Sequence, residues 1–270
     1  MAKIDPSARI EDGAVIAPDV EIGPFCVVGK NVKVGNGCRL VSHVSIAGHT
    51  TIGDGCTVFP FASLGAPPQD LGYRDEPTRL EVGDHCTIRE SVTMNLGTVK
   101  GGGLTKVGSR GFFMAYSHVG HDCIVGDDAI FANSATLGGH CVVGDSVYVG
   151  GLSAVHQFAR IGSQAMIGGV SGVRGDVIPY GFVTGQHAKL EGLNVVGMRR
   201  RKFSRERLHT VRAFYQKLFH GPGQFAERVK ALASERDSDP AVAEIYDFVS
   251  SEEKRSIVMP HRAVLRTQED

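Results

Sequence analysis

An aliphatic or aromatic residue recurs at every sixth position along most of this 270-residue chain. A glycine or another small residue usually follows it, and a second small residue lies four positions after it. A six-residue period fits neither an α-helix, with about 3.6 residues per turn, nor a long strand, whose side chains alternate. It is typical of a parallel β-helix of hexapeptide repeats, in which each hexad forms one short strand and a corner. The clearest run of these apolar positions is Phe113, Val119, Val125, Phe131, Leu137, Val143, Val149, Val155 and Ile161.

The period runs from Ile4 to Val173 with two interruptions, which predict loops because the six-residue phase resumes after each of them. Loops that interrupt a regular solenoid tend to line a binding site, although a surface insertion without a role is the alternative. We therefore expect a mainly β fold, a left-handed parallel β-helix over residues 1–192 with loop insertions at 65–79 and 96–106. The left hand is taken from hexapeptide families in general, since the spacing itself does not indicate a hand.

From about residue 193 the pattern changes to that of helices, and residues 193–270 are expected to form a C-terminal α-helical domain. Ser204 can cap one helix, Phe225 lies in a second, and Asp239-Pro240 starts a third. This domain can cover the end of the solenoid and its exposed edge. The apolar face expected for the first helix consists of Leu208, Val211, Tyr215, Leu218 and Phe219.

The repeat also explains the six cysteines, each of which lies four residues after a repeat hydrophobe. At that position a small residue points inward near a corner, and cysteine behaves there as a compact apolar side chain. An even count of cysteines would also suit disulfides or a metal site, but the chain contains no CxxC pair. We predict buried thiols at Cys26, Cys38, Cys56, Cys86, Cys123 and Cys141.

Charge and composition argue against several kinds of partner. The chain carries 29 basic and 29 acidic residues, so a role in binding nucleic acid has no electrostatic support at the level of the whole chain. No apolar run approaches the roughly 18 residues that span a bilayer. The start, MAKIDPSARI, has no charged segment followed by an apolar one, as a signal peptide would have. We expect a cytoplasmic protein without a transmembrane segment.

Three hexads form one coil of the expected solenoid, so residues that are three hexads apart lie above one another. Compared in this way, four histidines and an aspartate fall on one corner. None occupies an inward position, which disfavours buried structural histidines, and a scatter of unrelated surface histidines is the weaker alternative. Such a cluster could bind zinc through three imidazoles, as in trimeric β-helix carbonic anhydrases, or act through a neutral imidazole as a general base. The spacing leaves both chemistries open. The five residues are His118, His121, Asp122, His140 and His156.

Several stretches closely resemble the UDP-N-acetylglucosamine acyltransferases that begin lipid A synthesis, and the resemblance covers nearly the whole chain. These stretches are SHVGHDC, LGGHC, AVHQF, GGVSGV, QDLGYRDEPTR, RESVT, GTVKGGGLTKVG and MRRRKFSRE. The resemblance implies a homotrimer with active sites in clefts between neighbouring β-helices, and neither a cofactor nor a metal. It implies transfer of an (R)-3-hydroxyacyl group from acyl carrier protein to the glucosamine 3-hydroxyl of the UDP-sugar.

Carried over residue by residue, the resemblance implies that His121 is the general base, that Asp122 orients it, and that the Gly139 N–H stabilises the oxyanion. Gly169 matches the position that limits acyl length, with His187 nearby, and a glycine there implies a chain of about fourteen carbons. The planar guanidinium group of arginine suits phosphate oxygens. The basic run at residues 199–202 can also be the solvent-exposed start of a helix. The implied substrate contacts are Gln69, Asp70, His118, His140, His156, Gln157, Asn194, Arg200 and Arg201.

The chain departs from the family pattern at three places. Gly72 replaces the usual lysine, Asn95-Leu96 replaces a frequent His-Arg pair, and Val196 replaces a glutamate. These positions concern contacts with the sugar and the nucleotide. The 3-amino-3-deoxy analogue of the UDP-sugar is therefore an alternative acceptor, which would give an amide, and a non-enzymatic structural solenoid is a further alternative.

Overall fold

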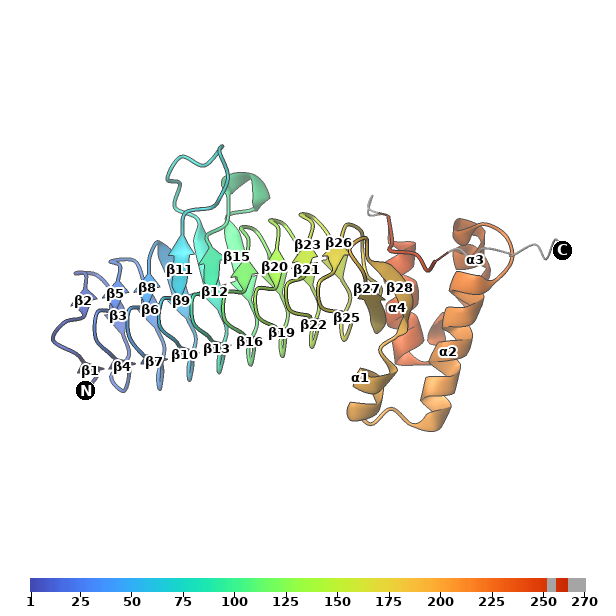
Figure 1. The fold of residues 1–270 in the computed structure, drawn as a ribbon, viewed down its shortest axis with the longest axis horizontal. Coiled ribbons are helices and arrows are strands. Elements are labelled where there is room, and N and C mark those ends of the chain that lie inside the picture. The colour runs from blue at the N-terminus through green and yellow to red at the C-terminus, as the bar shows by residue number, and fades with distance from the viewer. Residues whose placement is uncertain (252–255, 262–270) are drawn as a thin grey trace.

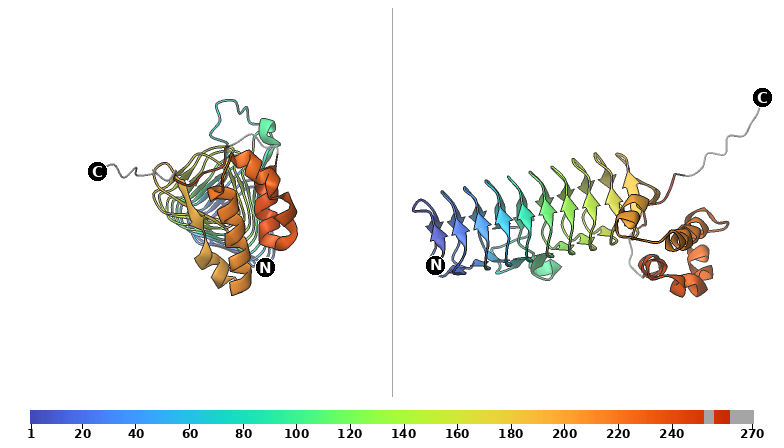
Figure 2. Two further views of the ribbon diagram at one scale, coloured as in Figure 1. Left: turned by 90° about the vertical axis from the view of Figure 1, so that its right-hand side faces the viewer. Right: turned by 90° about the horizontal axis from the view of Figure 1, so that it is seen from below.

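The computed structural model describes residues 1–251 and 256–261, which form an elongated parallel β-helix followed by a group of helices (Figure 1). Residues 252–255 and 262–270, which belong to the expected C-terminal helical domain, lie outside the described residues. Figure 2 shows that the coils stack along one axis and that the helices lie at the C-terminal end of the stack.

Three sheets form the sides of the solenoid, and from β1 to β27 consecutive strands along the chain belong to different sheets. Sheet A consists of β1 (Lys3–Ile4), β4 (Glu21–Ile22), β7 (Arg39–Leu40), β10 (Thr57–Val58), β13 (Thr87–Ile88), β16 (Phe112–Phe113), β19 (Ile130–Phe131), β22 (Tyr148–Val149), β25 (Met166–Ile167), β27 (Gly181–Thr184) and β28 (Lys189–Leu193). Sheet B consists of β2 (Arg9–Ile10), β5 (Val27–Val28), β8 (Ser45–Ile46), β11 (Ser63–Ala66), β14 (Thr93–Asn95), β17 (His118–Val119), β20 (Thr136–Leu137), β23 (Ala154–Val155) and β26 (Gly172–Val173). Sheet C consists of β3 (Val15–Ile16), β6 (Lys33–Val34), β9 (His49–Ile52), β12 (Arg79–Val82), β15 (Leu104–Val107), β18 (Ile124–Val125), β21 (Val142–Val143) and β24 (Arg160–Ile161).

Inward side chains of successive coils stack to form the core. Phe113 pairs with Phe131 in the next coil, and their ring centroids lie 5.0 Å apart. The second residue of each two-residue strand points inward, because side chains alternate across a strand. These residues are buried from Ile22 onward, whereas Ile4 is 43% exposed because no coil lies below it.

Most corners turn at a residue with a left-handed backbone conformation. From Arg110 to Val170 such a residue recurs at every sixth position, with φ between 56° and 64°. This conformation is uncommon for residues other than glycine and here follows from turning the chain through a corner. Asp122 and His140 are two of these residues, at the corner between sheets B and C. Because the strand alternation is broken there, neighbouring side chains can converge.

All six cysteines are free and buried, as predicted. The Cys123 thiol, for example, lies 3.1 Å from the carbonyl oxygen of Gly138 in the next coil. The cysteines therefore act as small core residues that fit beneath the corners.

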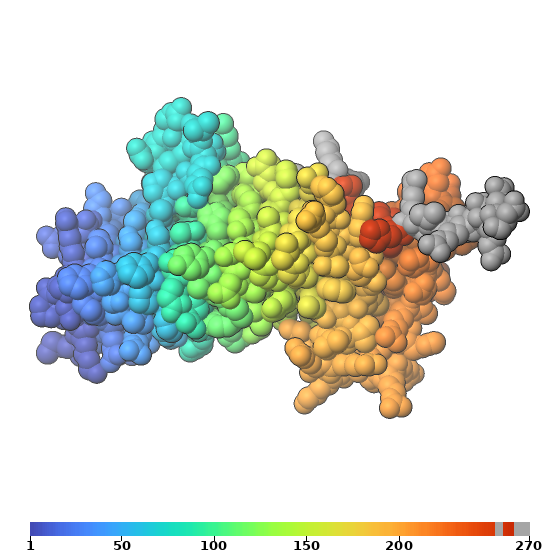
Figure 3. Space-filling view, viewed as in Figure 1, coloured from blue at the N-terminus to red at the C-terminus, as the bar shows by residue number. Residues whose placement is uncertain are grey.

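Both loops leave the solenoid at the corner between sheets B and C, one between β11 and β12 and the other between β14 and β15 (Figure 1). The strands extend into the expected interruptions, so the connecting segments are 67–78 and 96–103. The second segment, which we call loop 96–103, contains the 3-10 helix η1 (Val99–Gly101). The loops project as a knob from one side of the molecule (Figure 3).

The C-terminal helices agree with the sequence prediction. Ser204 caps α2 (Arg205–His220), and the five predicted apolar residues of that helix are buried. Helices α3 (Phe225–Ala231) and α4 (Pro240–Ser250) follow, and α1 (Val195–Arg200) and the 3-10 helix η2 (Ala233–Ser238) complete the set within the described residues. The sequence pattern does not predict the antiparallel pairing of β27 with β28. No helix in the described part of the chain has the length and hydrophobicity needed to cross a membrane.

A buried ion pair fastens the C-terminal segment to the end of the solenoid. The Asp176 carboxylate accepts hydrogen bonds from the backbone N–H and the Nε–H of Arg160, at 2.8 and 2.7 Å. Its side chain is completely buried. The Asp176 backbone pairs with Ser256 and Val258, and the Arg160 guanidinium lies 4.5 Å from the ring centre of Phe248 in α4.

Candidate active site

The corner between sheets B and C brings three of the predicted residues together. Nδ1 of His121 lies 2.8 Å from Oδ2 of Asp122, and Nε2 of His140 lies 3.6 Å from the same oxygen. The two imidazoles meet edge to face with centroids 5.0 Å apart. The Asp122 carboxylate is fully buried, whereas the His121 side chain is 14% exposed. A buried carboxylate therefore contacts an imidazole that remains accessible to a ligand.

Loop 96–103 and the strand after it hold Asp122 in place. The N–H and the hydroxyl of Thr98 donate to the two carboxylate oxygens, each at 2.7 Å. The Asp122 N–H donates to the Thr105 hydroxyl at 2.8 Å. Gly101 closes over the carboxylate so tightly that a side chain at that position would collide with it. The loop is therefore part of the site.

Gly139 lies directly beside the His121 ring in the next coil. A Cβ atom at Gly139 would lie 2.5 Å from Cε1 of His121, so any other residue there would displace the His121 ring. A Cβ atom at Gly120 would lie 2.9 Å from the Gly139 nitrogen, so a glycine at position 120 also keeps that N–H uncovered. Within the described residues the Gly139 N–H donates no backbone hydrogen bond. It is thus available to a negative charge that develops next to His121.

The two other histidines near His121 are favoured in their neutral form. Burial lowers the pKa of His140, and the Asp122 carboxylate only partly offsets this effect. Its ring stacks on Phe158, with centroids 4.4 Å apart. Burial, and secondly the proximity of His121, lowers the pKa of His118, whose Nδ1 lies 2.7 Å from the Thr93 hydroxyl. Neutral imidazoles suit hydrogen bonds to a polar substrate.

His156 and Gln157 lie one coil further along the same corner and are exposed. Nδ1 of His156 lies 3.1 Å from the Gln157 carbonyl oxygen. They extend the edge of the site toward the C-terminal end of the solenoid.

The first loop brings Asp70 toward the histidines, while Gln69 is exposed. A hydrogen bond of 2.7 Å from the Gly72 N–H is the main cause that lowers the pKa of Asp70, and His121, Lys100 and His140 contribute to the same shift. A Cβ atom at Gly72 would lie 3.5 Å from Nζ of Lys100. Lys100 of loop 96–103 thus supplies a cation next to the glycine that replaces the family's lysine.

Asn194, Arg200 and Arg201 line a separate cavity of about 610 Å³ between α1 and sheet A. The Asn194 side chain accepts the Gly197 N–H at 2.9 Å and donates to the Gln164 carbonyl at 3.0 Å. Within one chain the structure does not bring these three residues to the corner between sheets B and C, because sheet A is another side of the solenoid. The apolar lining of the cavity includes Ile130, Tyr148, Met166 and Phe182 of sheet A.

Gly169 lies at the corner between sheets A and B and is exposed. The nearest atom to a Cβ placed there would be the Gly151 carbonyl oxygen at 3.4 Å, so the fold does not require a glycine. His187 lies in the turn between β27 and β28 and lines a hollow of about 330 Å³ with Arg174 and Lys189.

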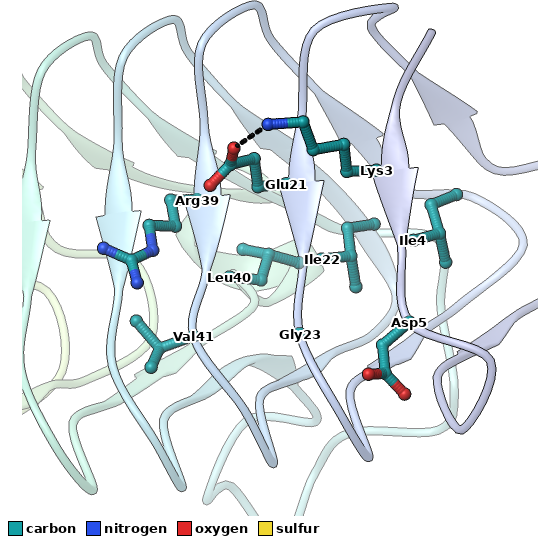
Figure 4. A pocket seen from close by; sticks show the side chains of 9 residues that line it. All are labelled: Lys3, Ile4, Asp5, Glu21, Ile22, Gly23, Arg39, Leu40 and Val41. Atoms are coloured by element: carbon teal, nitrogen blue, oxygen red, sulfur yellow. Dashed lines mark hydrogen bonds and ion pairs between the residues drawn. The ribbon is translucent and has the colours of Figure 1, made fainter.

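A further hollow of about 410 Å³ lies on sheet A near the N-terminus (Figure 4). Three of its polar side chains, Lys3, Glu21 and Arg39, form a row along the sheet, and the fourth, Asp5, lies apart from that row (Figure 4). The ion pair between Lys3 and Glu21, at 2.9 Å, is exposed, and such pairs contribute little to stability.

His121, Asp122 and His140 could also hold a metal ion, since their ligand atoms lie within 4.8 Å of one another. This set contains two imidazoles, whereas the zinc site considered from the sequence needs three. The Asp122 carboxylate already accepts two hydrogen bonds from Thr98 and faces Nδ1 of His121. These hydrogen bonds stabilise the charged carboxylate of Asp122, which therefore does not need a metal cation beside it.

Sequence reasoning missed three threonines that hold the site residues, namely Thr93, Thr98 and Thr105. Two of them lie in the stretch GTVKGGGLTKVG, which the repeat describes only as an interruption. Thr93 lies in β14 opposite His118 of β17, so its hydroxyl reaches Nδ1 of that histidine. Thr98 reaches the Asp122 carboxylate because loop 96–103 folds back over the corner, and Thr105, in β15 after the loop, accepts the Asp122 N–H.

Known proteins of one kind match this chain along its length. The family described as UDP N-acetylglucosamine O-acyltransferase, domain 2, matches residues 176–258, and the bacterial transferase hexapeptide family matches residues 13–48. The acyl-[acyl-carrier-protein]–UDP-N-acetylglucosamine O-acyltransferase of Azorhizobium caulinodans is 56% identical over 100% of this chain and 99% of its own length. The enzyme of the same name from Caulobacter vibrioides is 55% identical over 84% of this chain and 87% of its own length.

Solved structures are similar over the same range. The UDP-N-acetylglucosamine O-acyltransferase of Moraxella catarrhalis is 40% identical, with a TM-score of 0.92, and the match covers 94% of this chain and 99% of that one. LpxA from Acinetobacter baumannii is 41% identical with a TM-score of 0.91 and the same coverage. The predicted left-handed parallel β-helix with C-terminal helices is therefore confirmed.

Proposed function

This chain belongs to the UDP-N-acetylglucosamine O-acyltransferase family, and from that membership we propose that His121 is its general base. The activity is transfer of an acyl group from acyl carrier protein to UDP-N-acetylglucosamine in lipid A biosynthesis. The observation that carries the proposal is the contact between Nδ1 of His121 and the buried Asp122 carboxylate. It leaves Nε2 as the nitrogen that can accept a proton. Turnover by a His121→Ala variant tests this role.

The chemistry follows from these positions. Nε2 of His121 takes the proton of the acceptor hydroxyl, which we assign to the 3-position of glucosamine, while the oxygen attacks the thioester carbonyl carbon. A C–O bond forms, and the Gly139 N–H donates to the carbonyl oxygen as it becomes negative. The C–S bond then breaks, and the imidazolium returns the proton to the leaving thiolate of acyl carrier protein. Asp122 stabilises the imidazolium between the two proton transfers.

The surrounding groups suit the two substrates. Gln69 and Asp70 of the first loop and the neutral His118 and His140 offer hydrogen bonds to the sugar. Lys100 places a cation near Asp70, where it can meet an anionic group of the acceptor. His156 and Gln157, further along the same corner, are the remaining proposed substrate contacts.

The alternatives left open by the sequence are not favoured. The relatives that cover this chain are O-acyltransferases, which argues against an amide-forming reaction, a carbonic anhydrase and a purely structural solenoid. One of the unusual residues also has a structural explanation, since Asn95 donates to the Pro67 carbonyl at 3.1 Å and so ties β14 to the first loop.

We propose a homotrimer, because a single chain holds only half of the site. The base lies between sheets B and C, and the arginines suited to the nucleotide phosphates lie over sheet A. The corner between sheets A and B carries an apolar row that is more than half exposed, and such surfaces mark interaction sites. The exposed apolar residues of this row are Phe25, Phe61, Tyr116, Leu152 and Val170.

A threefold arrangement of these rows would complete the site. If three copies turn their rows toward a common axis, sheet B of each copy faces sheet A of the next. His121 of one copy would then lie across the same cleft from Arg200 and Arg201 of its neighbour. The cavity beside the arginines begins at Asp128 and Ile130, which follow His121 within half a coil, and extends along sheet A to Phe182. One end of the cavity is therefore near the coil that carries His121.

Mixed trimers are expected to recover activity from inactive parents. Protomers with His121→Ala and protomers with Arg200→Ala and Arg201→Ala each lack a different half of every site. After random mixing, about a quarter of the sites should contain both intact halves, since each mixed trimer has one. Turnover at a low concentration of UDP-sugar measures the recovery. A mixture of His121→Ala and Asp122→Ala protomers is the control and should stay inactive, and equal recovery in both mixtures would contradict a shared site.

Gly169→Met is expected to shift donor preference from about fourteen carbons toward about ten. Within one chain the new side chain would occupy open space beside the corner, and its Cβ meets no atom closer than 3.4 Å, so folding of the protomer should be unaffected. The measurement is kcat/KM for both donors, where the value for the longer one should fall about tenfold or more. An unchanged ratio, or a wild-type preference for the ten-carbon donor, would overturn the assignment of Gly169.

A further inference from the structure

We propose that Thr98 is a positioning residue for acyl transfer, which holds the Asp122 carboxylate on His121 and away from His140. This inference rests on the proposed role of His121 as the general base. Thr98 reaches no reacting atom of its own, and its effect passes through the carboxylate that orients the imidazole.

Two imidazoles are placed to compete for the same oxygen. Oδ2 of Asp122 lies 2.8 Å from Nδ1 of His121 and 3.6 Å from Nε2 of His140. A rotation of the carboxylate about its terminal bond changes both distances, and this bond has no sharp conformational preference of its own. The base keeps its partner only if something else fixes that rotation.

Thr98 supplies this restraint with two donors, one for each carboxylate oxygen. Its N–H donates to Oδ1 and its hydroxyl to Oδ2, both at 2.7 Å. The hydroxyl also accepts the Gly101 N–H at 3.1 Å, so its single proton is directed to Asp122. Thr98 is 4% exposed, which leaves little access for water to replace it.

Thr105 does not duplicate this function. Its hydroxyl accepts the backbone N–H of Asp122 and so fixes the corner of the chain, not the carboxylate. The orientation of the base therefore depends on loop 96–103, which leaves the solenoid before the corner that carries His121.

Thr98→Val tests the proposal because valine keeps the shape and the backbone N–H but removes the hydroxyl. We expect kcat to fall about ten- to a hundredfold, as for other lost hydrogen bonds to charged groups. KM for both substrates should stay within about threefold, since the loss acts on the base and not on substrate binding. Thr98→Ser restores the donor and should return kcat to near the wild-type value. A Thr98→Val enzyme with wild-type kcat would overturn the proposal.

A double-mutant cycle shows whether Thr98 acts through His121. In a His121→Ala background, Thr98→Val should cause no further loss of turnover, and additive losses would overturn the proposal. Failure of the proposed base and failure of the proposed role of Thr98 give different results. Substantial activity in His121→Ala alone would refute the base, whereas an inactive His121→Ala with a fully active Thr98→Val would refute only the role of Thr98.

Thr210→Val is the matched control, because Thr210 also loses a hydroxyl hydrogen bond, at 3.2 Å to the Glu206 carbonyl in α2, but lies far from the site. Its kcat and KM should not change. If Thr98→Val does not fold, Thr98→Ser decides alone. The proposal requires that variant to keep kcat within about threefold, and a loss of tenfold or more overturns it.

Discussion

His121→Ala is expected to lower kcat at least about 100-fold, because general-base help is typically worth 10²–10⁴-fold, or about 3–5 kcal/mol. Alanine cannot accept the hydroxyl proton, and the Asp122 carboxylate is buried beneath the ring and does not reach the cleft. The measurement is steady-state turnover with acyl carrier protein as donor and UDP-N-acetylglucosamine as acceptor.

The fold should survive this substitution, since the His121 side chain lies at an outward corner and contributes nothing to the stacked core. Circular dichroism, the melting temperature and the oligomeric state should match the wild type. His209→Ala, which removes an exposed histidine from α2, is the matched control and should keep full turnover. More than a tenth of wild-type turnover in His121→Ala would refute the base.

Asp176→Ala is expected to lower the free energy of unfolding by about 3–5 kcal/mol, the cost of breaking a buried ion pair by removing one partner. The substitution leaves the N–H and the guanidinium of Arg160 without the carboxylate that accepts both of their hydrogen bonds. The side chains of Asp176 and Arg160 are 0% and 14% exposed, so water compensates poorly. Urea unfolding under matched conditions measures the difference from the shift of the midpoint.

The local effect should appear where the ion pair fastens the chain. Amide exchange is expected to become faster at Val258, whose N–H donates to the Asp176 carbonyl. Asp237→Ala is the control, because its carboxylate is 84% exposed although it lies 2.6 Å from Arg236. An exposed pair contributes about 1 kcal/mol or less. If the two variants are destabilised equally, Asp176 does not fasten the C-terminal segment.

The solenoid could be predicted because its determinants are local and repeated. One inward position every six residues specifies a strand and a corner. Phe113 stacks on Phe131 because the inward positions of successive coils are aligned, as they are along the whole solenoid. The cysteines follow from the same register. Helix α2 could also be predicted from the sequence, because its cap Ser204 and its apolar face lie within one short segment.

The hairpin of β27 and β28 could not be predicted in this way. Its strands pair antiparallel after the repeat has ended, and its place is set by contact with the last coil, as in the pairing of β25 with β27. Nothing in the spacing of residues 181–193 describes that contact.

The amino-acid sequence by itself determined the coil, the corner that carries His121, Asp122 and His140, and the presence of two loops, but not the bounds of those loops. It could do so because a regular repeat converts positions along the chain into positions in space. Only the tertiary structure decided how the loops return, and so that Thr98 holds Asp122 and that Lys100 lies beside Gly72. The reason is physical, since an interrupted repeat carries no register, and the path of a loop depends on long-range contacts that local spacing does not encode.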